Sequence, residues 1–188
     1  MKYIALATFL AIGAAAVTAM APLPRKSPEF TIVEPSGKQT LLSSYKGKVV
    51  VLEFISTSCP HCQHNSMMLT KLHKELGPRG FQPLGVAFNS ADNASTVANF
   101  VKQFDVSFPV GYASPDTVLS YLGFSIMDRY VYPEIVVIDR KGMIRAQSPP
   151  QGDPALQDEN NLRMMIDGML KEGATTSSSK AAPAKKSS

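Results

Sequence analysis

The chain has no tryptophan, only two cysteines and no internal repeat in its 188 residues. Two cysteines cannot hold together a disulfide-dense small domain, so the fold must depend on side-chain packing. About 150 residues remain once two atypical ends are set aside. That length suffices for one hydrophobic core and is too short for two ordinary domains.

The central part of the chain also has no net positive charge. Lysine and arginine number 19 against 15 aspartate and glutamate residues, a formal net charge of +4. Four of the basic residues lie in the terminal segments: Lys2, Lys180, Lys185 and Lys186. Without these four, the 15 remaining basic residues balance the 15 acidic ones. A nucleic-acid-binding protein carries a basic stripe on its folded surface, so nucleic acid is not an expected partner.

The N-terminal residues 1–21 have the pattern of an export signal. Lys2 is followed by an uncharged apolar run that ends in small residues, an A-x-A-like cleavage sequence. Cleavage would follow Ala19 or Ala21; an uncleaved run is barely long enough to anchor the protein in a membrane. The segment has no cysteine, which excludes a lipoprotein anchor. We therefore expect an extracytoplasmic location, periplasmic or secreted, where disulfides persist.

The rest of the chain divides into three parts. Residues 22–28 are a proline-rich linker, residues 29–173 form the folded domain, and residues 174–188 are a Ser/Ala/Lys tail. The tail has no hydrophobic periodicity and is predicted to be disordered.

Hydrophobic patterns in the central domain predict strands that alternate with helices. An almost continuous apolar, β-branched run over 48–55 is typical of a strand buried on both faces, and a second buried strand is predicted over 81–88. A helix is predicted over 60–76, where a Gly-Pro pair stops it. Further helices are predicted over 95–104, 115–122 and 161–170, short extended pieces within 29–42, and strands over 108–111, 135–139 and 143–147. The pattern indicates an α/β fold with a mixed central sheet flanked by helices.

The two cysteines stand where the first buried strand meets the following helix, in the motif Cys59-Pro60-His61-Cys62. A helix N-terminus offers unpaired amide groups and the positive end of the helix dipole, which favour a thiolate at Cys59. Cys62, one turn into the helix, can resolve a mixed disulfide. Pro60 suits the first helical turn because it has no amide hydrogen to leave unpaired. The motif therefore predicts redox chemistry between the two sulfurs.

Other uses of a Cys-x-x-Cys pair fit this sequence less well. A purely structural disulfide across so short a loop would contribute only about 2 kcal/mol. Haem attachment requires a histidine after the second cysteine, where Gln63 stands. A zinc site requires four ligands, which His61 and His64 on one helix turn are poorly placed to complete. We therefore expect neither metal nor cofactor.

His61 lies between the two sulfurs and has two interpretations. It is predicted to stabilise the Cys59 thiolate, which would make the disulfide more oxidising. The alternative is an exposed helix residue with no part in the chemistry.

Several segments together resemble the thioredoxin superfamily and, within it, the exported TlpA/ResA-type branch, which overlaps the redoxin or AhpC/TSA-like group. The resemblance covers residues 29–147 and depends on five features: the lead-in 45–48, the strand 49–54, the motif 59–62, the inserted region 94–122 and the block 132–142. It implies a thioredoxin-like fold with an α/β segment inserted after the second sheet strand. It also implies an enzyme, a thiol-disulfide oxidoreductase.

The resemblance assigns roles to three residues outside the motif. Pro133 corresponds to the family's cis-proline, which lets the Tyr132 backbone face the disulfide and pair with an extended substrate; otherwise Pro133 simply begins a strand. Glu53, six residues before Cys59, corresponds to a buried acid beneath the active site. Burial raises the pKa of such an acid, and we expect Glu53 to relay a proton to or from Cys62. The alternative is a strand-end acid that pairs with a lysine.

Three positions depart from the family's pattern. Ser58 replaces a tryptophan, Asn65 stands where the ResA-type branch often has an acid, and Tyr132 is bulkier than the usual residue. These differences argue against specialisation for cytochrome c maturation. They also favour a substrate preference that differs from that of the family.

Three functions compete. In thiol-disulfide exchange, the leading function, Cys59 attacks a substrate disulfide, or the oxidised pair accepts a substrate thiol, and Cys62 resolves the mixed disulfide. The expected partners are protein thiols or disulfides and an extracytoplasmic or membrane protein that exchanges electrons, and the protein is expected to act as a monomer. In a thiol peroxidase with antioxidant activity, Ser56 would replace the threonine before the peroxidatic cysteine, although Leu52 occupies the position of its usual proline. A copper-delivering redoxin would use the soft thiolates, but such proteins add a distant histidine, and none follows Pro133.

Overall fold

The computed structural model describes residues 21–178. The predicted signal run before Ala21 and the end of the predicted tail, 179–188, lie outside the described residues. No helix within 21–178 is both long enough and apolar enough to cross a membrane.

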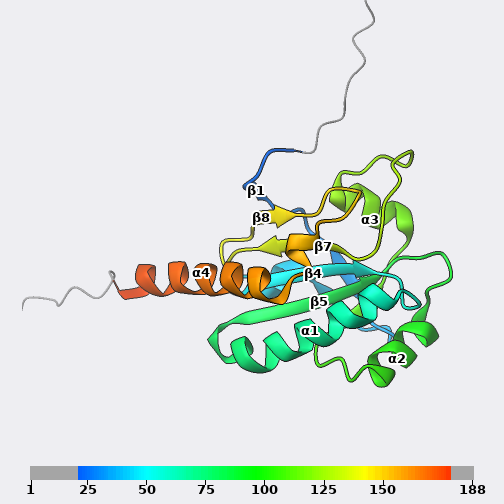
Figure 1. The fold of residues 1–188 in the computed structure, drawn as a ribbon, viewed down its shortest axis with the longest axis horizontal. Helices are drawn as coiled ribbons and strands as arrows, with labels where there is room; N and C mark the ends of the chain where they lie inside the picture. Colours follow the sequence, from blue (N-terminus) through cyan, green and yellow to red (C-terminus); the bar gives the residue numbers. More distant parts are fainter. Residues whose placement is uncertain (1–20, 179–188) are drawn as a thin grey trace, which may run out of the picture.

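The centre of the molecule is one mixed sheet with the strand order β1-β8-β7-β4-β5-β6-β2-β3 (Figure 1). The strands are β1 (Arg25–Lys26), β2 (Thr31–Val33), β3 (Gln39–Leu41), β4 (Val49–Ile55), β5 (Phe81–Ala87), β6 (Val110–Tyr112), β7 (Glu134–Ile138) and β8 (Met143–Gln147). β4 runs parallel to β5 and antiparallel to β7, and β5 runs parallel to β6. β4 and β5 are buried along their whole length, as their largely apolar sequences predict, and the polar Glu53 and Gln82 are buried with them.

Helices cover both faces of this sheet. They are α1 (Pro60–Leu76), α2 (Ala94–Gln103), α3 (Pro115–Leu122) and α4 (Glu159–Ser178), with short 3-10 turns η1 (Leu42–Tyr45), η2 (Gly77–Arg79) and η3 (Pro154–Leu156). On one face, α1, α2 and α4 share a hydrophobic cluster with Val51 and Val137. On the other face, α3 shares a second cluster with Phe30, Phe54 and Phe88. This three-layer α/β arrangement confirms the predicted fold class, and α2, β6 and α3 form the predicted insertion after β5.

Two boundaries near the ends of the domain differ from the prediction. Arg25 and Lys26, within the predicted linker, form β1 and pair with β8. A two-residue strand leaves no periodic pattern, because a distant partner creates it. α4 extends to Ser178, past the predicted end at 170 and into the predicted tail. The residues that follow Leu170 include good helix formers and no proline, so an established helix can propagate through them.

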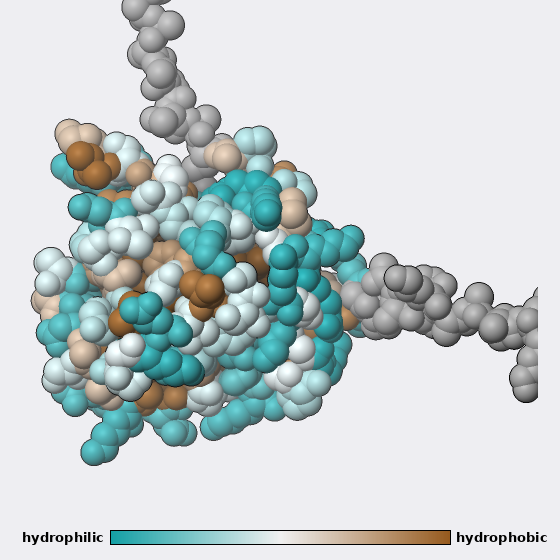
Figure 2. Space-filling view, turned by 180° about the vertical axis from the view of Figure 1, so that it is seen from behind, coloured by the Kyte–Doolittle hydropathy of each residue, from teal (hydrophilic) through white to brown (hydrophobic). Residues whose placement is uncertain are grey.

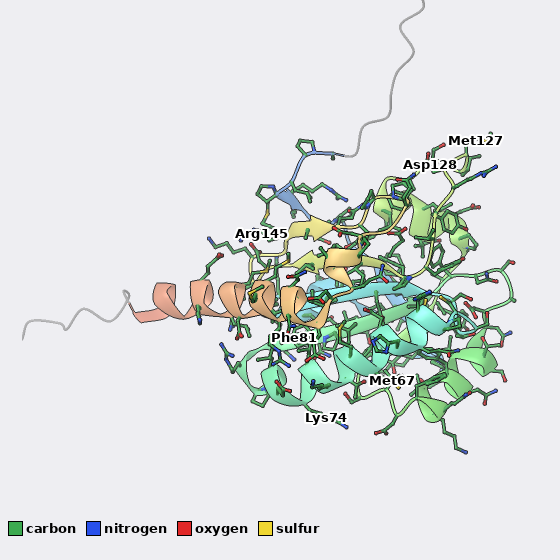
Figure 3. The ribbon with its side chains drawn as sticks, viewed as in Figure 1. Met67, Lys74, Phe81, Met127, Asp128 and Arg145 are labelled. Carbon is green, nitrogen blue, oxygen red and sulfur yellow. The ribbon has the colours of Figure 1, made fainter. Side chains whose placement is uncertain are left out.

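The loop between α3 and β7 exposes two large apolar side chains, Ile126 at 79% and Met127 at 84%. In the view from behind, Figure 2 shows an apolar projection in the upper left, where this loop lies. Met127 and Asp128 project from the tip of the loop, away from the sheet (Figure 3). This loop leads directly to Pro133.

Candidate active site

Cys59 lies where the loop after β4 becomes α1. It is the N-cap residue of the helix, with extended backbone angles (φ −83°, ψ 119°), and Pro60 begins the first turn. The Cys59 side chain is half-buried, whereas Cys62 is fully buried. Both are free thiols, and they lie close together. One sulfur is therefore open to a substrate while its neighbour is shielded, which suits attack by the first and resolution by the second.

The Tyr132–Pro133 peptide bond borders the reactive sulfur. It is cis, as the resemblance implies. The Cys59 thiol donates to the Tyr132 carbonyl oxygen across 3.8 Å. The Tyr132 ring packs against Phe88, with ring centroids 4.8 Å apart. Pairing of the Tyr132 backbone with a substrate strand stays a prediction.

Glu53 is fully buried in the middle of β4 and faces α1. Its carboxylate accepts hydrogen bonds from the Asn65 side-chain amide at 2.7 Å and from the Ser66 hydroxyl at 2.5 Å. Burial raises the pKa of Glu53 to about 7, although these hydrogen bonds act in the opposite direction. Neither partner is a lysine, so Glu53 is not the strand-end ion pair considered as the alternative.

Cys62 needs a base before it can react. Burial raises the pKa of the Cys62 thiol far above its usual value, and the nearby charges of Cys59 and Glu53 raise it further, against a backbone hydrogen bond from Ser56. Cys62 can attack a mixed disulfide only after losing its proton. A carboxylate whose pKa lies near 7 is a suitable acceptor, and Glu53 lies on the same face of the sheet.

Asn65 connects this site to one departure from the family pattern. It replaces an acid, and its side-chain amide donates to Glu53. A second carboxylate in this buried place would oppose the ionisation of Glu53, because like charges disfavour each other. The amide at position 65 therefore adds no second negative charge beside Glu53.

The other motif positions are at the surface. Ser58, Pro60 and His61 are exposed, and no side-chain partner of His61 is found within residues 21–178. A place between the two cysteines is compatible with stabilisation of the thiolate and also with a plain surface residue. Stabilisation of the Cys59 thiolate by His61 stays a prediction.

Asp92, which the sequence patterns did not single out, connects the cysteine loop to the loop between β5 and α2. It accepts hydrogen bonds from the Thr57 hydroxyl at 2.5 Å and from the backbone amides of Thr57 and Asn89. Thr57 lies two residues before Cys59, so Asp92 steadies the loop that carries the nucleophile. No motif marks Asp92, because its role depends on a contact between segments far apart in the chain.

Glu134, which directly follows Pro133, is a second residue that the sequence patterns missed. It pairs with Phe54 of β4, so its side chain lies on the face opposite Glu53. Glu134 is fully buried, and neither carboxyl oxygen has a hydrogen-bond partner among the described residues. Burial raises the pKa of Glu134 to about 8. The predicted strand began one residue too late to include it.

Comparison with known proteins decides the family. The model of the AhpC/TSA family matches residues 24–147, more than half of the chain. The chain belongs to the AhpC/TSA family. This AhpC/TSA protein is a TlpA/ResA-type redoxin of the thioredoxin superfamily.

Two relatives and one solved structure illustrate the similarity. Thiol-disulfide oxidoreductase ResA of Bacillus thuringiensis subsp. konkukian (strain 97-27) is 28% identical over 120 residues, 64% of this chain and 65% of that protein. Thioredoxin-like protein YneN of Bacillus subtilis (strain 168) is 29% identical over 122 residues, 64% and 68% of the two chains. The match thus spans slightly less than two thirds of the length of the ResA relative and slightly more than two thirds of YneN. A thiol:disulfide interchange protein of the thioredoxin family from Chlorobium tepidum TLS, 24% identical with a TM-score of 0.65 over 80% of this chain and 99% of that one, shows the same fold.

Proposed function

We propose that this AhpC/TSA protein is an extracytoplasmic thiol-disulfide oxidoreductase that exchanges electrons with protein thiols or disulfides. The observation that supports this most directly is the half-buried Cys59 at the start of α1, beside the Tyr132 carbonyl, with the buried Cys62 one turn away. The name of the ResA relative supports the class of reaction. The export signal predicted in residues 1–21 supports the location.

In the reducing direction, the Cys59 thiolate attacks one sulfur of a substrate disulfide and releases the other as a thiolate. Glu53 takes the proton of Cys62, and the Cys62 thiolate then attacks the Cys59 sulfur of the mixed disulfide. The Cys59–Cys62 disulfide forms, the second substrate thiolate leaves, and two electrons have passed to the substrate. The same steps in reverse oxidise a substrate dithiol. After each turnover, a partner protein outside the cytoplasm or bound to the membrane must return the Cys59–Cys62 pair to its starting redox state. The partner reduces the disulfide in the first direction and oxidises the dithiol in the second.

Trapping experiments with single cysteine variants test this function. With insulin as the disulfide substrate, Cys62→Ser should accumulate a mixed disulfide through Cys59, and Cys59→Ser should accumulate none. Mass spectrometry of the trapped species identifies the sulfur involved. Insulin reduction by Cys59→Ser at the rate of the unmodified protein would overturn the proposal.

A thiol peroxidase is the second candidate, because Ser56 lies in the loop that leads to Cys59. Its hydroxyl lies 3.2 Å from that of Ser58. The fully buried Leu52 occupies the position of the proline usual in such peroxidases. Peroxide consumption by Cys62→Ser would favour this candidate over exchange.

Copper delivery has less support. All three histidines lie on α1, and His73 is hydrogen-bonded to Ser107 away from the cysteines. Stoichiometric Cu(I) binding by the two thiols would be needed to revive this candidate.

A further inference from the structure

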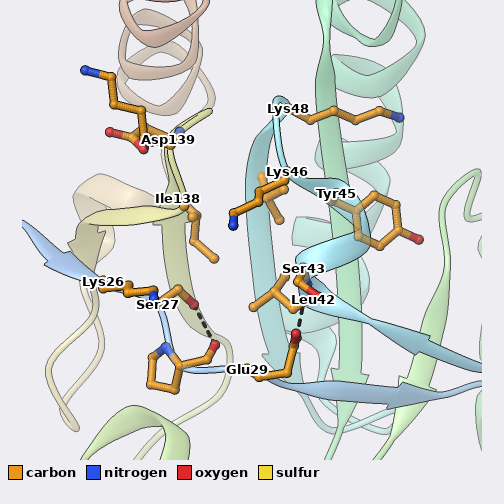
Figure 4. Close-up of a pocket in the computed structure, with 14 residues that line it drawn as sticks. Lys26, Ser27, Glu29, Leu42, Ser43, Tyr45, Lys46, Lys48, Ile138 and Asp139 are labelled. Carbon is orange, nitrogen blue, oxygen red and sulfur yellow. Dashed lines mark hydrogen bonds between the residues drawn. The ribbon is translucent and has the colours of Figure 1, made fainter.

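A pocket of about 290 Å³ opens at the end of the central strands β4 and β7 that lies away from the cysteines (Figure 4). Val50, near the start of β4, pairs with Ile138, at the end of β7, and both line it. Cys59 follows the other end of β4, and the seven residues of that strand separate the two places by roughly 20 Å. The pocket is therefore independent of the redox chemistry.

The floor of the pocket is apolar. Leu42, Val50 and Ile138 line it and are each less than 8% exposed. One wall is η1 and the segment that follows it, and the other is formed by β1 and the turn between β7 and β8. All three residues belong to the second hydrophobic cluster, so the pocket extends down to the core.

The rim of the pocket is basic. Four lysines line it: Lys26, Lys46, Lys48 and Lys141. Lys48 is hydrogen-bonded to Gln82, but the other three ammonium groups have no side-chain partner within residues 21–178. In Figure 4 the ammonium group of Lys46 lies over the opening, between the two walls.

The two acids of the lining are already engaged elsewhere. Glu29 accepts hydrogen bonds from the backbone amides of Phe30 and Ser43. Asp139 accepts from the backbone amides of Lys141 and Met143 and forms an ion pair with Arg145. Neither acid is paired with a rim lysine, although the sequence outside the terminal segments is formally neutral.

We propose that this pocket binds a short-chain amphiphilic anion. The anionic head would pair with the free ammonium groups, Lys46 first, and the apolar chain would lie on Leu42, Val50 and Ile138. The volume is at the lower end of the ~300–1,000 Å³ common for small-molecule sites, which favours a single short chain. A free carboxylate and the head of an anionic lipid share this chemistry.

Titration of the full chain with sodium octanoate, followed by amide NMR shifts, tests the proposal. Saturable shifts should cluster at the lining residues, among them Ser43, Tyr45 and Gly142. Lys46→Glu should weaken binding by about tenfold or more, because a charged hydrogen bond is lost and a repulsive charge is introduced. Lys102→Glu, an exposed lysine of α2, is the matched control and should bind like the unmodified protein.

Vesicles distinguish the two sources of the anion. If the protein binds phosphatidylglycerol vesicles but not phosphatidylcholine vesicles, and Lys46→Glu abolishes this binding, the ligand is the head of an anionic lipid. If the protein binds octanoate but neither kind of vesicle, the ligand is a free carboxylate. Lys141→Glu repeats the test on the opposite wall, and unchanged thiol-disulfide exchange verifies that each variant is folded. Binding of neither probe, or equal binding by Lys46→Glu and Lys102→Glu, would overturn the proposal.

Discussion

Glu53 and Glu134 are both fully buried on adjacent central strands, yet their surroundings differ. Glu53 accepts two hydrogen bonds from α1, the helix that carries the cysteines. Glu134 lies on the opposite face of the sheet, without a hydrogen-bond partner in the described part of the chain. Glu53 is therefore placed to move a proton, whereas Glu134 mainly adds an ionisation cost to the fold. The same Glu→Gln change should separate these two roles.

Glu53→Gln should remove a step from the pH profile of exchange. The pKa of Glu53 is raised to about 7, so its carboxylate form, the proton acceptor for Cys62, becomes available as the pH rises through that value. In single-turnover oxidation of the reduced protein, the variant should lack the rise near pH 7 and react roughly a hundredfold more slowly above it. Glu134→Gln should keep the rise. An unchanged profile in Glu53→Gln would show that the proton of Cys62 leaves by another route.

Glu134→Gln should flatten the dependence of stability on pH. Burial raises the pKa from 4.5 to about 8, so the folded protein holds the proton more tightly than the unfolded chain. The contribution of Glu134 to the free energy of unfolding is fully present below pH 4.5, and it is lost as the pH rises through about 8. Urea unfolding measures the free energy of unfolding at about pH 5 and at about pH 9. The decrease between these two pH values should be smaller in Glu134→Gln than in the unmodified protein, by on the order of 3–5 kcal/mol. The control is Glu75→Gln, which changes an exposed acid of α1. If the free energy of unfolding fell equally in the unmodified protein and in both variants, burial of the Glu134 carboxyl group would not be the cause of the pH dependence.

At the scale of the element, α1 gives its two sulfurs different surroundings. Cys59 is the half-exposed N-cap, and Cys62 is covered by the core. Iodoacetamide should therefore modify Cys59 about a hundredfold faster than Cys62 in the reduced protein, because the reagent needs an accessible thiolate. Peptide mapping after short exposure measures both sites. Comparable modification of both cysteines would mean that the helix opens readily and that Cys62 is not shielded.

The first turn of α1 also permits a test of His61. If the imidazole stabilises the Cys59 thiolate, His61→Ala destabilises the reduced form and makes the couple more reducing by about 30 mV. Equilibration with glutathione measures the shift. His64→Ala, exposed almost one turn further along the same helix, should leave the potential unchanged. Equal shifts in both variants would mean that His61 has no special effect.

The elements that could be predicted from sequence are those whose pattern is local. α1 begins at Pro60 and ends at Leu76 as predicted, and β4 and β5 follow from largely apolar runs. β1 was missed because its two residues become a strand only through β8. Cys59, Cys62 and Glu53 could be proposed from spacing and resemblance. Glu134 and Asp92 could not, since strand register and a contact between distant loops decide their surroundings.

At the scale of the whole molecule, the sheet keeps two chemistries apart. The carboxyl end of β4 carries the cysteines, and the opposite end borders the lysine-rimmed pocket. A ligand at that pocket can hold the protein at a surface or sense a small anion while Cys59 remains free for its partner. Because the pocket and Cys59 lie at opposite ends of β4, a substitution of Lys46 should leave the rate of thiol-disulfide exchange unchanged.

The ends of the sheet also predict the oligomeric state. Its edge strands are β1, with two residues, and β3, with three, and such short edges offer little backbone for pairing with another copy. Sedimentation equilibrium over a range of concentrations should therefore give the mass of one chain. Ile126→Ser combined with Met127→Ser is the control, because these exposed apolar side chains offer another means of contact. A dimer that this double variant abolishes would make the loop before Pro133 the interface, and a dimer that persists would show that the short edges do pair.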